Sequence, residues 1–258
     1  MELELFDSHC HMDEPRFDGD RNEVLVRMAN QKVTGCVCVG SDIETSLRCV
    51  RYARNTSQVY AAVGVHPHEA KFFRKEDLLL FESWIKDPKV VALGEIGLDY
   101  YYDHSPREVQ MQAFLAQLDF AYERDIPVIF HVRDAHGPMI ETLKERKNHL
   151  PQGVIHCFTG SWESAQEYIR LGFSIGLGGT VTFKNAPKVQ RVAREIPLEK
   201  LLIETDSPYL SPEPLRGRRN EPGNVFYVAK KIAELKELPI EEIGQATTEN
   251  AKMLYRII

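Results

Sequence analysis

Short apolar runs alternate with longer amphipathic stretches along the whole chain, and this alternation constrains the fold more than any other feature. The short runs are rich in β-branched residues and almost continuously apolar, which is typical of parallel strands covered on both faces. They occupy residues 3–9, 34–40, 59–65, 90–96, 126–132, 153–158, 173–179 and 200–206. The clearest helical stretches are residues 21–31, 105–125, 161–172, 223–237 and 241–256.

Eight strands that are each followed by a helix predict an α/β fold, the (β/α)8 TIM barrel. The length of 258 residues is common for this barrel, and no linker or repeat interrupts it, so we expect residues 1–258 to form one domain. The alternative is an open doubly wound sheet, but no glycine-rich dinucleotide fingerprint follows the first strand. Ser105, followed by Pro106 and Glu108, predicts a capping box at the start of the helix over 105–125.

Charge and cysteine usage limit the partners and the compartment. A net charge of −6 argues against a protein that grips nucleic acid by bulk electrostatics, although it leaves room for a local basic site. The five cysteines include no C-x-x-C pair, which favours free thiols in a reducing compartment. Since we find neither a signal-peptide pattern nor an apolar run of about 18 residues, we expect a cytoplasmic protein without a membrane or a stable protein partner.

Polar side chains with metal-binding chemistry gather at the carboxyl ends of the predicted strands. Alternate residues of a strand share a face, so His9 and His11 at the end of the first strand point to one place. Two carboxylates, Glu95 and Asp206, close the fourth and eighth strands. Five of the nine histidines lie at such ends: His9, His11, His66, His131 and His156. In a parallel barrel all these ends converge on one face, where active sites are built.

Several imidazoles and carboxylates converging without partners would carry a heavy desolvation cost, which divalent cations relieve. The set exceeds the four ligands of a closed tetrahedral site, so we expect two ions. We place His9, His11 and Asp206 on one ion and His131 and His156 on the other, with Glu95 shared. The mixed nitrogen and oxygen ligands suit Zn²⁺, Mn²⁺, Fe²⁺ or Ni²⁺ better than Mg²⁺, which stays a candidate.

Arginines are concentrated in the loop over residues 211–225, which should border the barrel mouth. The interpretation we carry forward is that Arg216, Arg218 and Arg219 bind phosphate, for which guanidinium is well shaped, with Arg133 as a further contact. The alternative is a solvated turn whose arginines pair with surface carboxylates.

Three further features of the mouth have open roles. His66 is a candidate to contact a phosphate, to protonate the leaving oxygen, or only to hydrogen-bond a carboxylate. Glu204 shares a strand face with Asp206 and is a candidate base or a residue that orients a ligand histidine. The tyrosines at 100–102 could stack bases, but we favour packing.

These residues lie in motifs that, taken in order, closely resemble the TatD-type metal-dependent deoxyribonucleases of the amidohydrolase superfamily. The resemblance spans essentially the whole chain. Its motifs are "DSHCHMD", "GVHPHE", "GEIGLDY", "HVRDA", "HCFTGS", "ETDSPYL", "RGRRNEP" and "TTENA". The family's ligands fall on His9, His11, Glu95, His131, His156 and Asp206. Cys10 stands between the two histidines where small or apolar residues are common, and its side chain should face away.

The resemblance implies a barrel with two divalent ions that hydrolyses phosphodiesters. The leading hypothesis is therefore a 3′–5′ DNA exonuclease acting on single-stranded ends, with DNA as a transient partner and Asp206 or Glu204 handling the proton of the attacking water. Two alternatives remain. One is a two-metal hydrolase of the same superfamily acting on an ester or amide outside nucleic acid, and the other is a binding module without catalysis.

Overall fold

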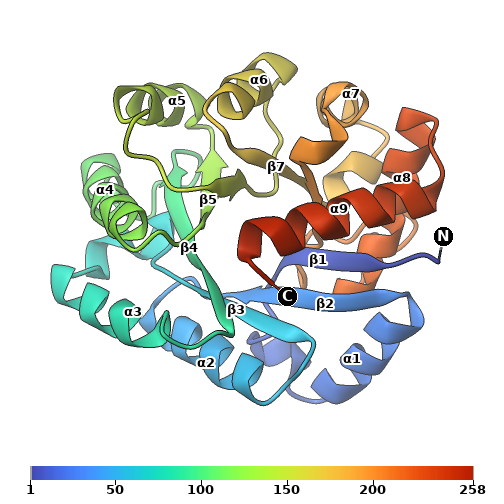
Figure 1. Ribbon diagram of the computed structural model, residues 1–258, viewed down its shortest axis with the longest axis horizontal. Coiled ribbons are helices and arrows are strands. Elements are labelled where there is room, and N and C mark those ends of the chain that lie inside the picture. Colours follow the sequence, from blue (N-terminus) through green and yellow to red (C-terminus); the bar gives the residue numbers. More distant parts are fainter. Residues whose placement is uncertain (1, 258) are drawn as a thin grey trace.

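Eight parallel strands in sequence order form a nearly closed barrel surrounded by helices (Figure 1). The computed structural model describes residues 2–257. The strands are β1 (Leu5–Cys10), β2 (Val33–Val39), β3 (Val59–Val63), β4 (Val90–Asp99), β5 (Val128–Arg133), β6 (Gly153–Ile155), β7 (Ser174–Leu177) and β8 (Leu201–Ile203). The helices are α1 (Arg21–Asn30), α2 (Ile43–Arg54), α3 (Leu78–Trp84), α4 (Arg107–Glu123), α5 (His136–Glu145), α6 (Trp162–Arg170), α7 (Pro187–Glu195), α8 (Val225–Lys236) and α9 (Ile240–Tyr255).

This topology confirms the (β/α)8 TIM barrel and excludes the doubly wound sheet, because the strand order never reverses. All eight predicted strands and the five predicted helices are present, with ends that differ by a few residues. The predicted capping box is wrong. The Ser105 hydroxyl instead donates to the carbonyl of His68 at 2.8 Å and accepts from the amide of Lys71 at 3.1 Å, and Pro106 directly precedes α4. The Ser105 hydroxyl therefore bonds to a distant segment of the chain in place of the amides at the start of α4.

The seam between β1 and β8 is closed by contacts just beyond the end of β8. Cys10 and Ser207 form an isolated parallel bridge. The amide of Asp206 donates to the carbonyl of His9 at 3.0 Å, and the amide of His11 donates to the carbonyl of Ser207 at 2.7 Å. The seam therefore brings two segments that are almost two hundred residues apart in sequence side by side, each with candidate ligands.

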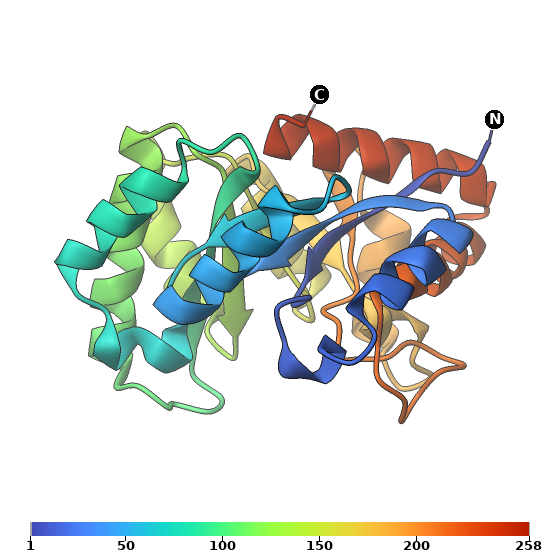
Figure 2. The same cartoon turned by 90° about the horizontal axis from the view of Figure 1, so that it is seen from below.

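Two apolar layers hold the barrel together. The larger one lies between the strands and the surrounding helices, and the smaller one fills the barrel interior around Phe6, Val39 and Ile129. The interior layer continues into α9, whose Tyr255 hydroxyl donates to the carbonyl of Ser8 at 3.0 Å. Figure 2 shows α9 across one end of the barrel, with the loops that follow β1 and β8 at the opposite end. The mouth at that opposite end is consequently left for polar residues.

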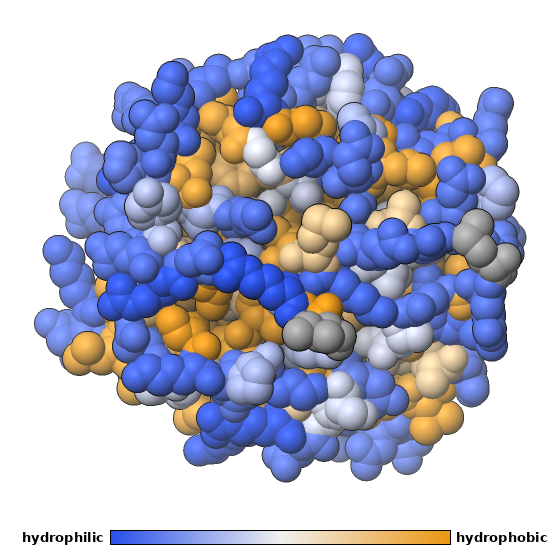
Figure 3. Space-filling view, in the orientation of Figure 1, coloured by the Kyte–Doolittle hydropathy of each residue, from blue (hydrophilic) through white to orange (hydrophobic). Residues whose placement is uncertain are grey.

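The face of the molecule that carries α9 is mostly hydrophilic, with smaller apolar patches among the hydrophilic side chains (Figure 3). Within residues 2–257, no helix combines the length and apolar character required to cross a bilayer.

Candidate metal centre

The six residues expected to bind metal all come to the barrel mouth. His9 lies in β1 and His11 directly follows that strand, while Glu95 lies in β4 and His131 in β5. The remaining two come from the segments after β6 and β8, namely His156 and Asp206. Parallel strands place these ends together, so a cluster forms from residues distant in sequence.

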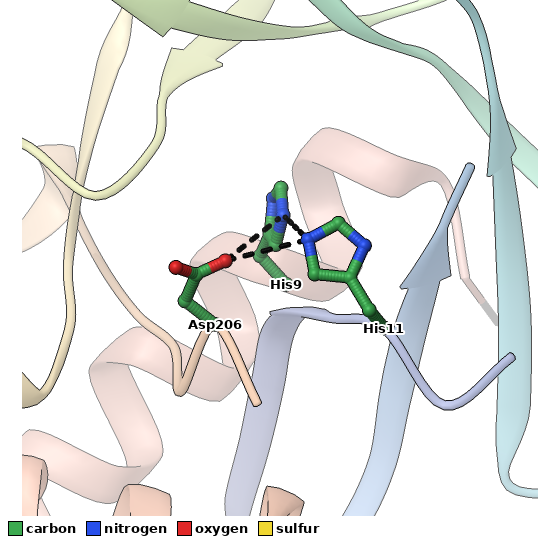
Figure 4. Close-up of side chains that lie close together, drawn as sticks. All are labelled: His9, His11 and Asp206. Atoms are coloured by element: carbon green, nitrogen blue, oxygen red, sulfur yellow. Dashed lines mark hydrogen bonds and ion pairs between the residues drawn. The ribbon is translucent and has the colours of Figure 1, made fainter. Parts of the chain in front are cut away.

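The first group of ligand atoms surrounds a common point beside β1. The Nε2 atoms of His9 and His11 are 3.2 Å apart. One carboxylate oxygen of Asp206 lies 3.7 Å and 3.4 Å from these two nitrogens (Figure 4). Ligands bound tetrahedrally at the usual zinc distances are about 3.3–3.6 Å apart. The spacing of this group therefore fits one divalent cation.

The second group shares Glu95 with the first. Glu95 Oε1 lies 2.6 Å from His131 Nδ1 and 2.6 Å from His156 Nε2, and these two nitrogens are 3.4 Å apart. The other oxygen of Glu95, Oε2, faces the first group at 3.6 Å from His9 Nε2 and 4.0 Å from His11 Nε2. One carboxylate thus presents an oxygen to each group.

Glu95 and His9 already have the protonation of metal ligands, whereas His11, His131 and His156 must first release a proton. Burial opposes ionisation of Glu95, but the surrounding imidazoles of His156, His66 and His131 outweigh it and hold its pKa well below the usual range. Burial, reinforced by His156, lowers the pKa of His9 well below the usual range. Burial also opposes protonation of the other three rings, but neighbouring carboxylates raise the pKa of His11 to about 9 and also raise the pKa values of His131 and His156. An ionised carboxylate and a neutral imidazole are the forms that bind divalent cations.

Neighbouring acceptors fix the orientation of two of the rings. Nδ1 of His11 lies 2.8 Å from the carbonyl of Val39, so this nitrogen keeps a proton and Nε2 is the nitrogen that faces the cluster. Nε2 of His131 lies 3.1 Å from Asp99 Oδ2, which leaves Nδ1 directed at Glu95. Both contacts select the ring nitrogen that faces the cluster.

Asp99 is a site residue that the sequence analysis did not assign. It is fully buried, and its Oδ2 also lies 2.9 Å from His68 Nε2, while its Oδ1 accepts from the amides of Tyr101 and Tyr102. The available signal was its place in β4, four residues after Glu95, where alternation favours the same face.

His66 and Glu204 are both buried next to the candidate ligands, which leaves their roles open. His66 is buried, with Nε2 3.6 Å from Glu95 Oε1. Glu204 has no solvent exposure; its Oε1 accepts from the amide of Cys157 and lies 3.6 Å from His156 Nδ1. Glu204 therefore stands behind a ligand histidine, whereas the Asp206 side chain keeps 16 % exposure.

The four arginines differ in how they are held. The guanidinium of Arg133 lies 4.3 Å and 4.6 Å from the ring centres of Tyr101 and Tyr102. Arg216 lies 3.8 Å from the ring centre of Phe183, and Arg218 is exposed. Both tyrosines are about half exposed, at 58 % and 48 %, and the Tyr102 ring also stacks on His104 with 5.3 Å between ring centres. They therefore pack at the rim and still present aromatic surface.

Arg219 follows the alternative interpretation, that of an arginine paired with carboxylates. It donates to both carboxylate oxygens of Asp20 at 2.8 Å and 2.7 Å and to Glu221 at 2.8 Å. These contacts anchor the loop after β8 to the segment before α1. A phosphate at Arg219 would have to displace them.

A TIM barrel whose mouth gathers four imidazoles and two carboxylates suited to divalent cations is typical of the metal-dependent hydrolases built on this fold. The chain belongs to the TatD family, since the sequence pattern described as "TatD related DNase" matches residues 6–256. It is accordingly a metal-dependent hydrolase of that family.

Individual relatives match this chain over almost their full length. The chain is 47% identical to the metal-dependent hydrolase YabD of Bacillus subtilis (strain 168), covering 98% of this chain and 99% of that protein. It is 34% identical to the 3′-5′ ssDNA/RNA exonuclease TatD of Pectobacterium carotovorum, covering 98% and 100%. The crystal structure of YjjV, a TatD homologue from Escherichia coli K12, superposes with a TM-score of 0.92 at 35% identity, covering 98% of each chain.

Proposed function

We propose that this protein uses two divalent cations to hydrolyse phosphodiester bonds, removing nucleotides from the 3′ end of single-stranded DNA. The observation that carries the proposal is Glu95, whose two oxygens face two different groups of ligand atoms. The exonuclease name of one relative supports the choice of nucleic acid.

The bound ions would polarise a phosphoryl oxygen and activate water in an in-line displacement. Asp206 is the group best placed to accept the proton of that water. Its Oδ1 faces His9 and His11, while its other oxygen points away from both rings (Figure 4). Its side chain is also partly exposed.

Glu204 supports the reaction indirectly in this proposal. Its carboxylate lies 3.6 Å from Nδ1 of His156, beyond hydrogen-bond distance, so we expect it to act on this ring through its charge while Nε2 faces Glu95. His66, buried beside Glu95, helps to hold the pKa of that carboxylate low.

The rim of the mouth supplies contacts for the substrate. Arg133, Arg216 and Arg218 provide positive charge for backbone phosphates in a chain whose net charge is negative. Tyr101 and Tyr102 expose aromatic surface beside Arg133 on which bases can stack. A local patch of this kind does not require a basic protein. Arg219 we expect to position the loop.

A 5′-labelled single-stranded oligonucleotide incubated with Mn²⁺ tests the proposal. Stepwise shortening from the 3′ end is expected, and an inverted nucleotide at the 3′ terminus should block it. A parallel set of amides and lactones provides the comparison. Hydrolysis of those compounds with the oligonucleotide left intact would contradict the proposal and favour the alternative ester or amide hydrolase.

A further inference from the structure

A second group of metal-binding side chains lies away from the mouth. Four of the five cysteines are fully buried, and all four belong to the apolar layer between the strands and the helices: Cys10, Cys36, Cys38 and Cys49. Cys10 and Cys38 are paired neighbours on β1 and β2, and Cys49 faces them from α2. The mouth centre uses none of them.

Two of these thiols and one carboxylate meet at a single point. Cys38 Sγ lies 3.2 Å from Cys49 Sγ and 3.8 Å from Asp13 Oδ1. The three ligand atoms all lie within 4.8 Å of one another, and the Asp13 side chain is only 3 % exposed. Two sulfurs and one oxygen bound to Zn²⁺ would be about 3.6–3.8 Å apart, so the sulfurs need to separate by roughly half an ångström.

The surrounding charges balance for a divalent ion. Two thiolates and the Asp13 carboxylate carry three negative charges, and the ion contributes two positive ones. Arg48 supplies the last positive charge, with Nη2 3.5 Å from Asp13 Oδ2. A buried group that is neutral in sum avoids most of the cost of burying isolated charge.

We propose that Asp13, Cys38 and Cys49 bind a thiophilic divalent cation such as Zn²⁺ at a site separate from the centre in the mouth. Binding replaces the proton of each thiol, so two protons leave for each ion bound. The ion joins the loop after β1 to β2 and α2. Because Asp13 lies two residues after His11, the site also braces the loop that follows a mouth ligand.

A disulfide between Cys38 and Cys49 is the competing chemistry. It would require the sulfurs to approach to about 2.05 Å and an oxidant to reach them. Both thiols are fully buried, and burial raises the pKa of each, which keeps the reactive thiolate scarce. A metal ion recruits the thiolates directly, so the geometry favours it.

Titration of the full-length protein with Co²⁺ tests the proposal, because sulfur ligands give a charge-transfer band that imidazole and carboxylate ligands do not. We expect the band to reach the intensity of one thiolate-bound Co²⁺ per chain, while ions taken up at the mouth add to the bound Co²⁺ but not to the band. In weakly buffered solution the parent should release two more protons per chain than Cys49→Ser at saturating Co²⁺. Absence of the band at saturating Co²⁺ would overturn the proposal. So would three free thiols, in place of five, in the denatured protein.

Variants locate the site. Cys49→Ser is expected to abolish the band, while Cys157→Ser, at the mouth, and Cys36→Ser, on the same strand as Cys38, are matched controls that should keep it. Asp13→Asn preserves side-chain volume and should weaken Co²⁺ binding at least tenfold, a shift that remains measurable if Cys49→Ser fails to fold. A band lost in Cys157→Ser, or unchanged affinity in Asp13→Asn, would contradict the assignment.

Discussion

Glu95 is the residue through which we expect two groups of candidate ligands to form one centre. Its position in the middle of β4 lets each carboxylate oxygen face a different set of imidazoles. The residues around it divide into those that face the cluster and those that act on a facing residue from behind. Asp99 behind His131 and Glu204 behind His156 belong to the second kind.

The role of Glu204 can be separated from that of a proton acceptor. We expect Glu204→Gln to weaken binding of the metal ion at His156 by about 10–100-fold, because the negative charge beside that ring is lost. Activity should then return at saturating metal concentration. Metal titrations of the rate for the variant and the parent measure this. A rate that stays at least about 100-fold low at saturation would instead make Glu204 the proton acceptor.

His136 makes the stability of the protein depend on pH. Burial lowers its pKa to about 4, and Nδ1 contacts the Tyr168 hydroxyl at 3.1 Å. Between pH 4 and about 6.5 the unfolded chain binds a proton here that the folded chain does not, so stability is complete above this window and falls as the pH falls. We expect about 2 kcal/mol to be lost across it, with the partial exposure of the ring taken into account.

The measurement is the free energy of unfolding from pH 7 to pH 4 for the parent and His136→Gln. The decrease in the free energy of unfolding between pH 6.5 and pH 4 should be about 2 kcal/mol smaller in this variant. Replacement of the exposed His149 by Gln should leave that decrease unchanged. Parallel slopes for the parent and His136→Gln would contradict the prediction.

At the scale of elements, the barrel depends on its seam, because β8 is short and pairs with β1 only beyond its end. Asp7 supports this joint. It is fully buried and accepts from the Thr205 amide at 2.8 Å and the Thr205 hydroxyl at 2.6 Å. These bonds cross the seam immediately below Asp206, so they serve stability and ligand placement together.

We expect Asp7→Ala to lower the free energy of unfolding by about 2–4 kcal/mol, because the two Thr205 donors and the amide of His9 lose their acceptor. Denaturant unfolding measures this change. Thr205→Ser keeps both donors and should cost less than about 1 kcal/mol. An Asp7→Ala protein within about 0.5 kcal/mol of the parent would show that the seam does not rest on these bonds.

The mouth provides a matched pair of arginines, Arg133 at the end of β5 and Arg219 in the loop after β8. We expect Arg133→Ala to raise the KM for single-stranded DNA about tenfold with kcat nearly unchanged, because the side chain holds substrate and transition state alike. Arg219→Ala should leave KM within about twofold, since Arg219 is paired with Asp20 and Glu221. Steady-state kinetics at several salt concentrations check both. Equal effects of the two substitutions would contradict the assignment of Arg133 to substrate binding and of Arg219 to holding the loop.

Elements were easier to predict from sequence than their local contacts. The β-branched runs identify all eight strands, because burial on both faces leaves a nearly continuous apolar pattern. The Ser105 capping box failed, since a hydroxyl that can cap a helix can equally bond to His68 and Lys71 from another segment. The arginine-rich sequence around Arg219 likewise favours phosphate binding. Its partner Asp20 comes from a distant segment of the chain, which the sequence does not show to be adjacent.

At the scale of the whole molecule, the fold and the centre rest on different interactions. The two apolar layers and the cover provided by α9 hold the barrel, while the six candidate ligands sit at the opposite end. The same separation explains what the sequence could reveal. Barrel closure brings the ligands together, so predicting the fold also predicted their convergence. The four buried thiols follow from side-chain packing between β1, β2 and α2, which the strand pattern does not specify.

Because of this separation, we expect chelation to abolish hydrolysis while the far-ultraviolet circular dichroism stays unchanged. The melting temperature should fall by several degrees, since bound ions stabilise the folded state by mass action. Activity should return when Mn²⁺ is added back. Loss of secondary structure on chelation would mean that the ions hold the barrel itself.

We propose that residues from five strand ends bind two cations that share Glu95. Anomalous diffraction from crystals grown with Mn²⁺ or Zn²⁺ tests it most directly. The account predicts two peaks at the mouth, one among His9, His11 and Asp206 and one between His131 and His156, on either side of Glu95. A single peak, or peaks that leave Glu95 without contact to both ions, would contradict it.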